Sequence, residues 1–482
     1  MIRTKKHLNI SWLIAFISSG FIAGIAMTPL LGDKVSSPNL FILGASLIFA
    51  AFVNRKKHII FLAILAGVAL GLSRGGAVLQ NYEVYENLFG QLVVINGIVS
   101  EDTSMDTSGR QKIKLKNITL NDKEMSGQVW VSTSDQSTIK RSDNLSVTGL
   151  LSEGFGNFPA SIHQAQIIEI IRIQHADPAR ELRDWFAHNI RQLINEPEAS
   201  LGIGFLTGQH SNLPEDLNNS LRILGLTHII VASGYNLTIL VRFSRQAFMR
   251  ISKYWATVSS LFLIFGFVLV TGFSPSMSRA ALITGLSIIA WHFGRRIHPV
   301  VLLTFVAALT AFINPGYVWG DLGWYLSFAA FAGVIILSPL IYHYFWGDKK
   351  KPGSLHQIFL ETLSAQIMTA PIIAFAFSQY APLAIPANLL ILIFIPLAMI
   401  LTFVAGLAAI GSASLAFLSA PATFILSYIT LVVDKLSLLP VALIEVNYGL
   451  GYLVFTYGLI IISMIYFWRR TKHDFLKTSV VE

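Results

Sequence analysis

Several stretches of this chain are apolar for roughly 20 residues in a row, the length that an α-helix needs to cross a lipid bilayer. Most of these stretches lie within residues 255–468, where polar residues interrupt them at only a few places. In hydrocarbon every backbone N–H and C=O group needs a partner within the protein, so an isolated spanning segment has to be helical. The sequence therefore predicts a polytopic α-helical membrane protein, with about 10–12 transmembrane helices by hydropathy.

The composition supports this class and excludes several kinds of site. Apolar residues make up 54% of the chain and charged residues 13%, whereas about 25% of the residues in soluble domains are charged. The mean hydropathy is +0.61. The chain contains no cysteine, which excludes disulfides, thiolate nucleophiles and cysteine metal sites.

The positive charges predict the orientation of the chain in the membrane. The net charge is +9, and Lys and Arg gather in short segments between apolar runs, at 2–6, 54–58, 294–298, 347–351 and 468–472. Such segments stay on the cytoplasmic side. We therefore expect both termini to be cytoplasmic and the polar block near 80–180 to lie outside. The positive charge is better explained by topology than by nucleic-acid binding.

The polar block has the alternation of β-strands. Five candidate strands are separated by turn residues, at 92–99, 112–120, 128–132, 145–151 and 166–173. Five short strands predict a small barrel of the OB type, although an SH3-like barrel fits the pattern nearly as well. Lys112, Lys114 and Lys116 share one strand face because they are two residues apart. They are candidate DNA contacts, against the simpler interpretation of a solvated outer face.

The chain is thus predicted to have five parts. N-terminal transmembrane helices occupy 1–80 and an extracytoplasmic OB-like β domain 81–176. Amphipathic helices that lie at the membrane interface follow over 177–224. A transmembrane domain spans 225–470, with a cytoplasmic tail at 471–482. Segments 196–243 and 434–449 can either span the membrane or re-enter it.

A few polar residues interrupt the apolar runs of the transmembrane domain: His228, Ser233 and Asn236 in one run, and Arg279 in another. Polar groups are costly in hydrocarbon and usually face a partner or a water-filled path. These residues therefore predict a conduit. The structural alternative for Arg279 is a side chain that snorkels to the interface.

Short segments between 206 and 388 occur in a specific order: Leu206-Thr-Gly, Leu213-Pro214, Gly225-Leu-Thr-His228, Ser233-Gly234, Thr271-Gly272, Pro275-Ser276, Arg279-Ala280, Gly294-Arg-Arg, Asn314-Pro315, Asp321, Ser327-Phe328, Gln366 and Pro386-Ala-Asn388. In this order they resemble the central membrane region of the ComEC family, the bacterial competence DNA-uptake channel. The resemblance implies that His228, Ser233, Gly234, Asn236, Arg279, Asp321, Gln366 and Asn388 line the channel or the DNA path. Their structural alternatives are a helix cap for Asp321 and hydrogen bonds between helices for Gln366 and Asn388.

The chain departs from the family in two places. Relatives commonly have His two residues after the Ser-Gly pair, where this chain has Asn236. Amides do not titrate, which argues against an obligatory proton role there. Many relatives also continue into a metallo-β-lactamase-like domain, whereas this sequence has no His-x-His-x-Asp-His cluster and no P-loop. We therefore expect no catalytic residue, metal site or cofactor in these residues.

The resemblance implies an inner-membrane channel that translocates single-stranded DNA into the cytoplasm during natural transformation. Its partners would be single-stranded DNA, membrane lipid, further copies of the chain, and a separate DNA receptor, cytoplasmic helicase and nuclease. One alternative is a transporter of a small solute or lipid-linked precursor, which has a similar hydropathy profile. Another is a membrane enzyme that uses Ser233 or His228, but no Ser/His/Asp arrangement is visible.

Overall fold

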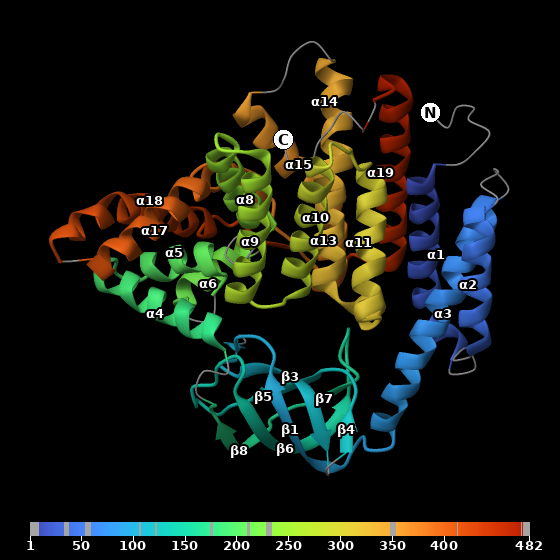
Figure 1. Cartoon of the computed structure of the whole chain (residues 1–482). Coiled ribbons are helices and arrows are strands. Elements are labelled where there is room, and N and C mark those ends of the chain that lie inside the picture. The colour runs from blue at the N-terminus through green and yellow to red at the C-terminus, as the bar shows by residue number, and fades with distance from the viewer. Residues whose placement is uncertain are drawn as a thin grey trace. The chain divides into compact units, whose positions relative to one another are not determined.

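The computed structural model describes residues 9–32, 38–53, 59–105, 108–120, 123–173, 177–209, 213–227, 234–347, 353–411, 413–473 and 475 (Figure 1). These residues form two compact units, which we describe separately. Unit 1 comprises residues up to Asp177 together with Ile297–Trp324, and unit 2 comprises Pro178–Arg296 together with the residues from Tyr325 onward.

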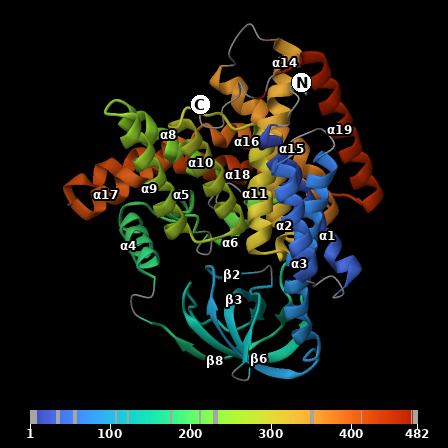
Figure 2. The same cartoon turned by 45° about the vertical axis from the view of Figure 1, so that its right-hand side comes forward.

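Unit 1 contains five helices and a β domain. The helices are α1 (Ile10–Leu31), α2 (Pro38–Val53), α3 (Ile59–Glu86), α11 (Pro299–Ile313) and α12 (Gly316–Gly320). Helix α1 packs against α3 and α11, and α2 packs against α3 (Figure 2). A Cβ atom at Gly67 would overlap the backbone of Ile17, and one at Gly71 would overlap that of Phe21. Gly67 and Gly71, four residues apart on α3, therefore permit close backbone contact with α1, as expected for helix packing in membranes.

The β domain is a closed five-stranded barrel. Its ring runs β1 (Leu92–Val99), β3 (Gln111–Leu120), β5 (Val129–Thr133), β7 (Ala160–Ile162), β6 (Asn144–Glu153) and back to β1. The β5–β7 pair is parallel and the other ring pairs are antiparallel. Two short strands, β2 (Ser104–Met105) and β4 (Lys123–Met125), pair with β3. The closed barrel fits the OB-like expectation.

One predicted strand is present but does not take its expected place in the barrel. The segment predicted as the fifth strand forms β8 (Gln166–Ile171), which pairs with β6 outside the closed ring. The ring is closed instead by β7, which is only three residues long and buried at every position. A strand without exposed alternate residues has no period-two pattern, so the sequence did not reveal it.

The interior of the barrel explains why the other strands were recognisable. Strand β1 alternates between exposed and buried side chains up to Gly97, and β3 alternates up to Lys116. Inward-pointing aliphatic residues from all five ring strands fill the core, among them Ile95, Ile113, Leu115, Val131, Leu145, Val147 and Ile162. Burying one face of each strand fixes the pairing register, since a slip of one residue would turn these side chains outward.

Unit 2 is almost entirely helical. Its helices are α4 (Pro178–Leu193), α5 (Glu198–Thr207), α6 (Glu215–Ile223), α8 (Gly234–Met249), α9 (Lys253–Thr271), α10 (Pro275–His292), α13 (Leu322–Ala332, from Tyr325 onward), α14 (Ser338–Trp346), α15 (Ser354–Phe377), α16 (Ala384–Leu392), α17 (Ile395–Gly411), α18 (Ala420–Ser437) and α19 (Leu450–Thr471). A π-helix η2 (Gly333–Leu337) joins α13 to α14, and a 3₁₀-helix η3 (Ala413–Ser419) precedes α18. Two short strands, β9 (Gln379–Tyr380) and β10 (Ile444–Glu445), pair with each other.

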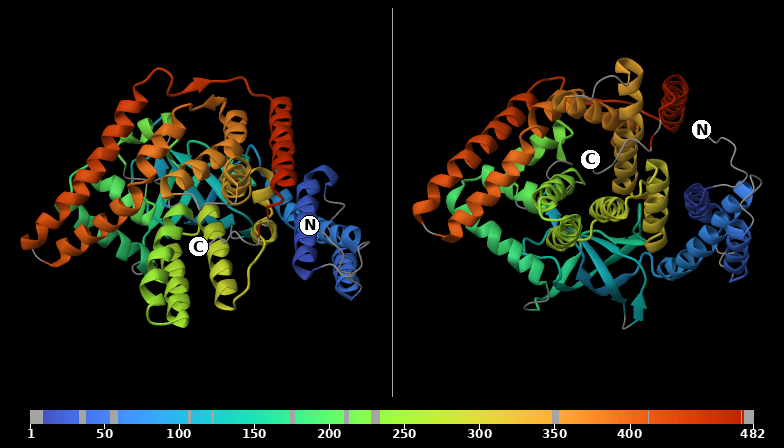
Figure 3. Two further views of the ribbon diagram at one scale, coloured as in Figure 1. Left: turned by 90° about the horizontal axis from the view of Figure 1, so that it is seen from above. Right: turned by 45° about the horizontal axis from the view of Figure 1, so that its top comes forward.

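The helices of unit 2 pack in groups that are visible in the figures. Helices α8, α9 and α10 lie side by side (Figure 1) and share an apolar core. Helices α17 and α18 also run beside each other, and α19 lies at the edge of the unit against α14 and α15 (Figure 3). No residue of α19 is fully buried, although Met464 and Phe467 pack partly against α14 and α15. Other apolar side chains of α19, among them Leu450, Val454 and Ile462, are exposed.

The helices support the membrane class predicted from the sequence. Among the described residues, seven helices are long and apolar enough to cross a membrane, and the bent pair α16–α17 makes an eighth if it is one span. Helices α2 and α11 are apolar but shorter than 18 residues. These numbers are lower than the 10–12 expected from hydropathy, partly because polar interruptions and short helices divide the apolar runs.

The amphipathic helices predicted within 177–224 are present as α4 and α6. In α4 the buried face carries Arg180, Arg183, Ala187 and Ile190, whereas Leu182 and Trp185 are about half exposed. The apolar residues of α4 therefore divide between the protein core and the outer surface, which fits a helix at a membrane interface.

Candidate functional site

Arg279 is a buried cation in the first turns of α10. Ser274 caps this helix by accepting a hydrogen bond from the backbone N–H of Met277 at 3.2 Å, and Pro275 occupies the first turn. This local sequence starts the helix and so places Arg279. The residue is only 5% exposed, so the snorkelling interpretation does not describe it.

The partners of Arg279 are neutral. Its Nη2 donates to Ser276 Oγ at 3.3 Å, and its guanidinium carbon lies 5.3 Å from the ring centroid of Phe328. Its Nη1 has no hydrogen-bond partner among the described residues. Burying a cation without an opposite charge is costly. The site therefore has unused capacity to bind an anion or water.

Helix α13 completes this site. Ser276 Oγ and Ser327 Oγ are 3.2 Å apart, and Phe328 is the next residue. Two segments that are far apart in the sequence, at 275–279 and 327–328, thus meet around one guanidinium. A π-helix begins five residues after Phe328, and such helices frequently occur at functional sites.

Helix α8 approaches α10 beside Arg279. A Cβ atom at Gly234 would lie 3.1 Å from the Cβ of Ala280, so the glycine permits close contact there. Asn236 is 1% exposed, and its Nδ2 donates to the carbonyl oxygen of Phe205 at 3.1 Å. This amide therefore links α8 to α5. His228 and Ser233 lie outside the described residues.

The remaining residues predicted for the path differ in their surroundings. Gln366 is half-buried on α15. Asn388 is 3% exposed on α16, and its Oδ1 has no hydrogen-bond partner in the part of the chain that the structure describes. The expected bond to another helix is thus not made through that oxygen. The helix pair α16–α17 bends by 48° at the break after Leu392.

Asp321 belongs to unit 1 and caps a helix. Its Oδ1 accepts a hydrogen bond from the backbone N–H of Trp324 at 2.7 Å, in agreement with the capping interpretation. Burial raises the pKa of the Asp321 carboxyl above its usual value, the N–H of Trp324 lowers it, and Lys114 also lowers it. Asp321 thus belongs to unit 1, whereas Arg279 belongs to unit 2.

We expect Asp321→Ala to lower the free energy of unfolding by about 1 kcal/mol, the usual contribution of an N-cap. Asp321→Asn should retain most of this stability because the amide oxygen can still accept the bond. Thermal denaturation of the purified protein measures both variants. A melting temperature of Asp321→Ala equal to that of the unaltered protein would contradict the capping role.

Two signals in the sequence were missed. No Asp or Glu occurs between Asp216 and Asp321, while eight cations do: Arg222, Arg242, Arg245, Arg250, Lys253, Arg279, Arg295 and Arg296. This long stretch has an excess of positive charge that favours phosphate. The second signal is Glu361, a carboxylate within the apolar helix α15.

Glu361 has polar neighbours inside unit 2. Its Oε1 accepts a hydrogen bond from Gln357 Nε2 at 2.7 Å. It also interacts electrostatically with Arg242 and with Tyr235 of α8. An ionisable residue within a membrane helix is a functional candidate, and here it faces a cation of the acid-free stretch.

The outer face of the barrel carries both basic and aromatic side chains. Lys112 and Lys114 point outward from β3. Lys114 pairs across the strands with Trp130 of β5, and Trp130 pairs with Ser161 of β7. Paired residues share a face of the sheet. Lys114 therefore lies beside an indole ring, with Lys112 two residues away on the same strand face. Lys116 is opposite Ile98 of β1.

Trp130 is the centre of an aromatic cluster. Its ring centroid lies 5.2 Å from that of Phe155 and 5.3 Å from that of His163. Phe155 is 49% exposed. Lys114 forms an ion pair with Glu101 at 2.7 Å, so Lys112 and Lys116 carry more of the available charge. Basic and aromatic side chains together are typical of surfaces that bind single-stranded nucleic acid.

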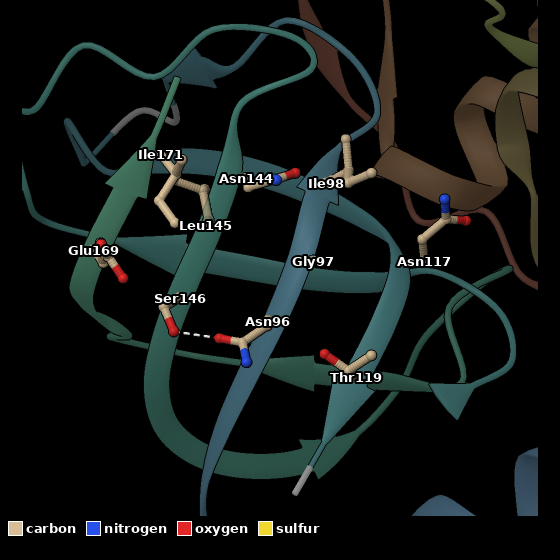
Figure 4. Close-up of a pocket in the computed structure, with 10 residues that line it drawn as sticks. All are labelled: Asn96, Gly97, Ile98, Asn117, Thr119, Asn144, Leu145, Ser146, Glu169 and Ile171. Atoms are coloured by element: carbon tan, nitrogen blue, oxygen red, sulfur yellow. Dashed lines mark hydrogen bonds between the residues drawn. The ribbon is translucent and has the colours of Figure 1, made fainter. Parts of the chain in front are cut away.

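The barrel also has a groove of about 430 Å³ over β1, β3, β6 and β8 (Figure 4). Its polar lining is mostly uncharged, as in Asn96, Asn117 and Asn144, and Asn96 contacts Ser146. The charged residue of the lining is Glu169. A carboxylate repels anions, so this groove is less suited to an anionic ligand than the face around Trp130.

Comparison with known proteins agrees with these observations. The model of a family described as Competence protein matches residues 205–471, which is more than half of the chain. ComE operon protein 3 of Bacillus subtilis (strain 168) is 27% identical over 218 residues, which cover 44% of this chain and 26% of that protein. No solved structure matches the chain.

Proposed function

Because this chain belongs to the Competence protein family, we propose that it forms a channel that translocates single-stranded DNA across the bacterial cytoplasmic membrane during natural transformation. The observation that carries this proposal is that Arg279 is buried beside neutral side chains. It lies within residues 205–471, which match the family model. A small-solute transporter could share the hydropathy profile. It would have no evident need for a buried cation that is surrounded by Ser276 and Phe328.

The proposed mechanism is passage by weak, repeated contacts. A phosphate that leaves water needs donors along its way, and Arg279 with its serine neighbours supplies them. Neutral partners suit this role, because an acid at this site would compete with phosphate. Binding has to remain weak, since a tightly held strand would stop moving. No step in this scheme makes or breaks a covalent bond, so strand cleavage and pulling would belong to a separate nuclease and helicase.

The barrel face around Trp130 would act earlier, as a stacking surface for the incoming strand. We expect the double variant Trp130→Ala and Phe155→Ala to bind an oligo-dT strand at least about fivefold more weakly, since one base stack contributes about 1–3 kcal/mol. Fluorescence anisotropy with the purified full chain measures this affinity. Asn96→Ala in the groove is the matched control and should bind normally. If the control weakens binding and the double variant does not, the groove is the contact surface.

A gene deletion tests the proposed process. It should abolish transformation by added DNA while growth is unchanged. The same DNA introduced by electroporation should still transform the deletion strain, which separates uptake from recombination. Persistent transformation together with a metabolite uptake defect would favour the transporter alternative.

The proposed topology has both termini in the cytoplasm and the barrel outside. A reporter that is active only outside the cytoplasm should work when fused near Ser134, and should fail at Lys350 or after Lys477. Activity at Lys350 would overturn the orientation of that loop, which follows from its excess of lysines.

A further inference from the structure

A second group of cations lies at the other end of the α8–α9–α10 bundle. Helices α8 and α10 run in the same direction: Gly234 approaches Ala280, and 11 residues further along each helix Arg245 lies over Trp291. Lys253 of α9 reaches the same indole. The Arg245 guanidinium carbon is 5.3 Å and the Lys253 Nζ 5.1 Å from the Trp291 ring centroid.

The local sequence holds this cluster in place. Ser252 caps α9 by accepting a hydrogen bond from the backbone N–H of Trp255 at 3.2 Å, which makes Lys253 the first residue of the helix. Thr257 Oγ1 and His292 Nδ1 are 2.9 Å apart and join α9 to α10. The positive end of the α9 dipole adds to the charge of Lys253. Anions are therefore favoured here.

Apolar side chains near these cations are exposed, which is unfavourable in water. Ile251 is 68% exposed next to Arg250, and Phe293 is 72% exposed before the Gly294-Arg-Arg segment. From Lys253 an exposed apolar stripe continues along α9, formed by Trp255, Val258, Phe262, Phe265 and Leu269. At 1.5 Å per residue the stripe is about 21 Å long, enough to pass through the hydrocarbon of one leaflet, about 15 Å deep.

We infer that Lys253, Arg250, Arg245 and Trp291 form a binding site for the phosphate headgroup of an anionic phospholipid, whose acyl chain lies along the exposed stripe of α9. The cations match the phosphate, and the aromatic side chains fit the membrane interface. A single DNA strand would also be attracted to the cations. It could follow the apolar stripe of α9 only by carrying its charged phosphates into hydrocarbon, which is costly. This site is separate from the one at Arg279 and does not depend on the proposed channel function.

Lipid addition to the purified full chain tests this site. Phosphatidylglycerol should raise the melting temperature more than phosphatidylcholine with the same acyl chains. The double variant Arg250→Gln and Lys253→Gln should bind phosphatidylglycerol about 25-fold more weakly, because each basic residue near anionic lipid contributes about fivefold. Native mass spectrometry of the lipid-bound protein measures this change. Arg222→Gln, an exposed cation on α6, is the matched control and should bind normally.

Two further measurements keep the inference open to refutation if the double variant folds poorly. Lys253→Arg should retain phosphatidylglycerol binding because the charge remains, and Phe262→Ser should weaken it by interrupting the stripe. Equal stabilisation by the two lipids would overturn the inference. A second result would also overturn it: Lys253→Gln binds an oligo-dT strand more weakly but binds phosphatidylglycerol normally. The cations would then belong to the DNA path.

Discussion

Arg279→Ala is expected to reduce DNA uptake per inserted molecule by about tenfold or more. A hydrogen bond to a charged group contributes about 1.5–3 kcal/mol, and each ~1.4 kcal/mol corresponds to a factor of ten. The guanidinium is buried, has neutral neighbours and keeps one nitrogen without a hydrogen-bond partner among the described residues. Its removal takes away a donor for phosphate without leaving an acid unpaired.

The same substitution should not destabilise the protein strongly. Arg279 makes no ion pair among the described residues, and burying a cation without an acid disfavours the folded state. Arg279→Ala should therefore accumulate in the membrane at close to normal levels. Arg279→Lys should keep part of the activity, because a point charge attracts phosphate although the planar fork is lost.

Labelled DNA that becomes nuclease-resistant, divided by the amount of inserted protein, measures the effect. Ser276→Ala is a positioning control, since its hydroxyl bonds Arg279 Nη2 at 3.3 Å, and should give a smaller defect. If uptake falls only in proportion to the protein level, Arg279 contributes to folding or stability and not to DNA passage. Normal uptake per molecule in Arg279→Ala would end the assignment of this residue to the DNA path.

Gly67→Ala is expected to reduce the amount of folded protein sharply. The added Cβ would overlap the carbonyl oxygen of Ile17, and in Gly71→Ala it would overlap that of Phe21. Because these are backbone atoms, relief requires the two helices to separate. Overpacking typically costs about 1–3 kcal/mol and sometimes more, a large part of a total stability of about 5–15 kcal/mol.

Two other glycines in membrane helices serve as controls for this effect. The atoms nearest to a Cβ at Gly75 belong to the side chain of Thr28 and not to the backbone, so Gly75→Ala should have an intermediate effect. Nothing lies within 4 Å of a Cβ at Gly458 of α19, so Gly458→Ala should be neutral. Thermal stability and gel-filtration profiles of the four purified variants measure this order. Equal stability of Gly67→Ala and Gly458→Ala would show that α1 and α3 do not pack as closely as the structure has them.

The membrane class could be predicted from the sequence because it depends on local physics. An apolar run of about 20 residues has few alternatives to a helix when water is absent. The period-two patterns of β1 and β3 likewise reflect a burial that repeats within one strand. The order of the short segments between 206 and 388 pointed to the family, which the match over residues 205–471 supports.

The closure of the barrel and the surroundings of each polar residue were decided by the tertiary structure. Strand β7 has three buried residues and a parallel partner far away in the chain, so no local pattern distinguished it from a loop. Arg279 and Asp321 looked alike in the sequence, as charged residues beside apolar runs. One lies buried against Phe328 and the other caps a helix. The sequence alone determines which side chains are costly in a membrane, whereas the packing of distant segments decides which partners lower that cost.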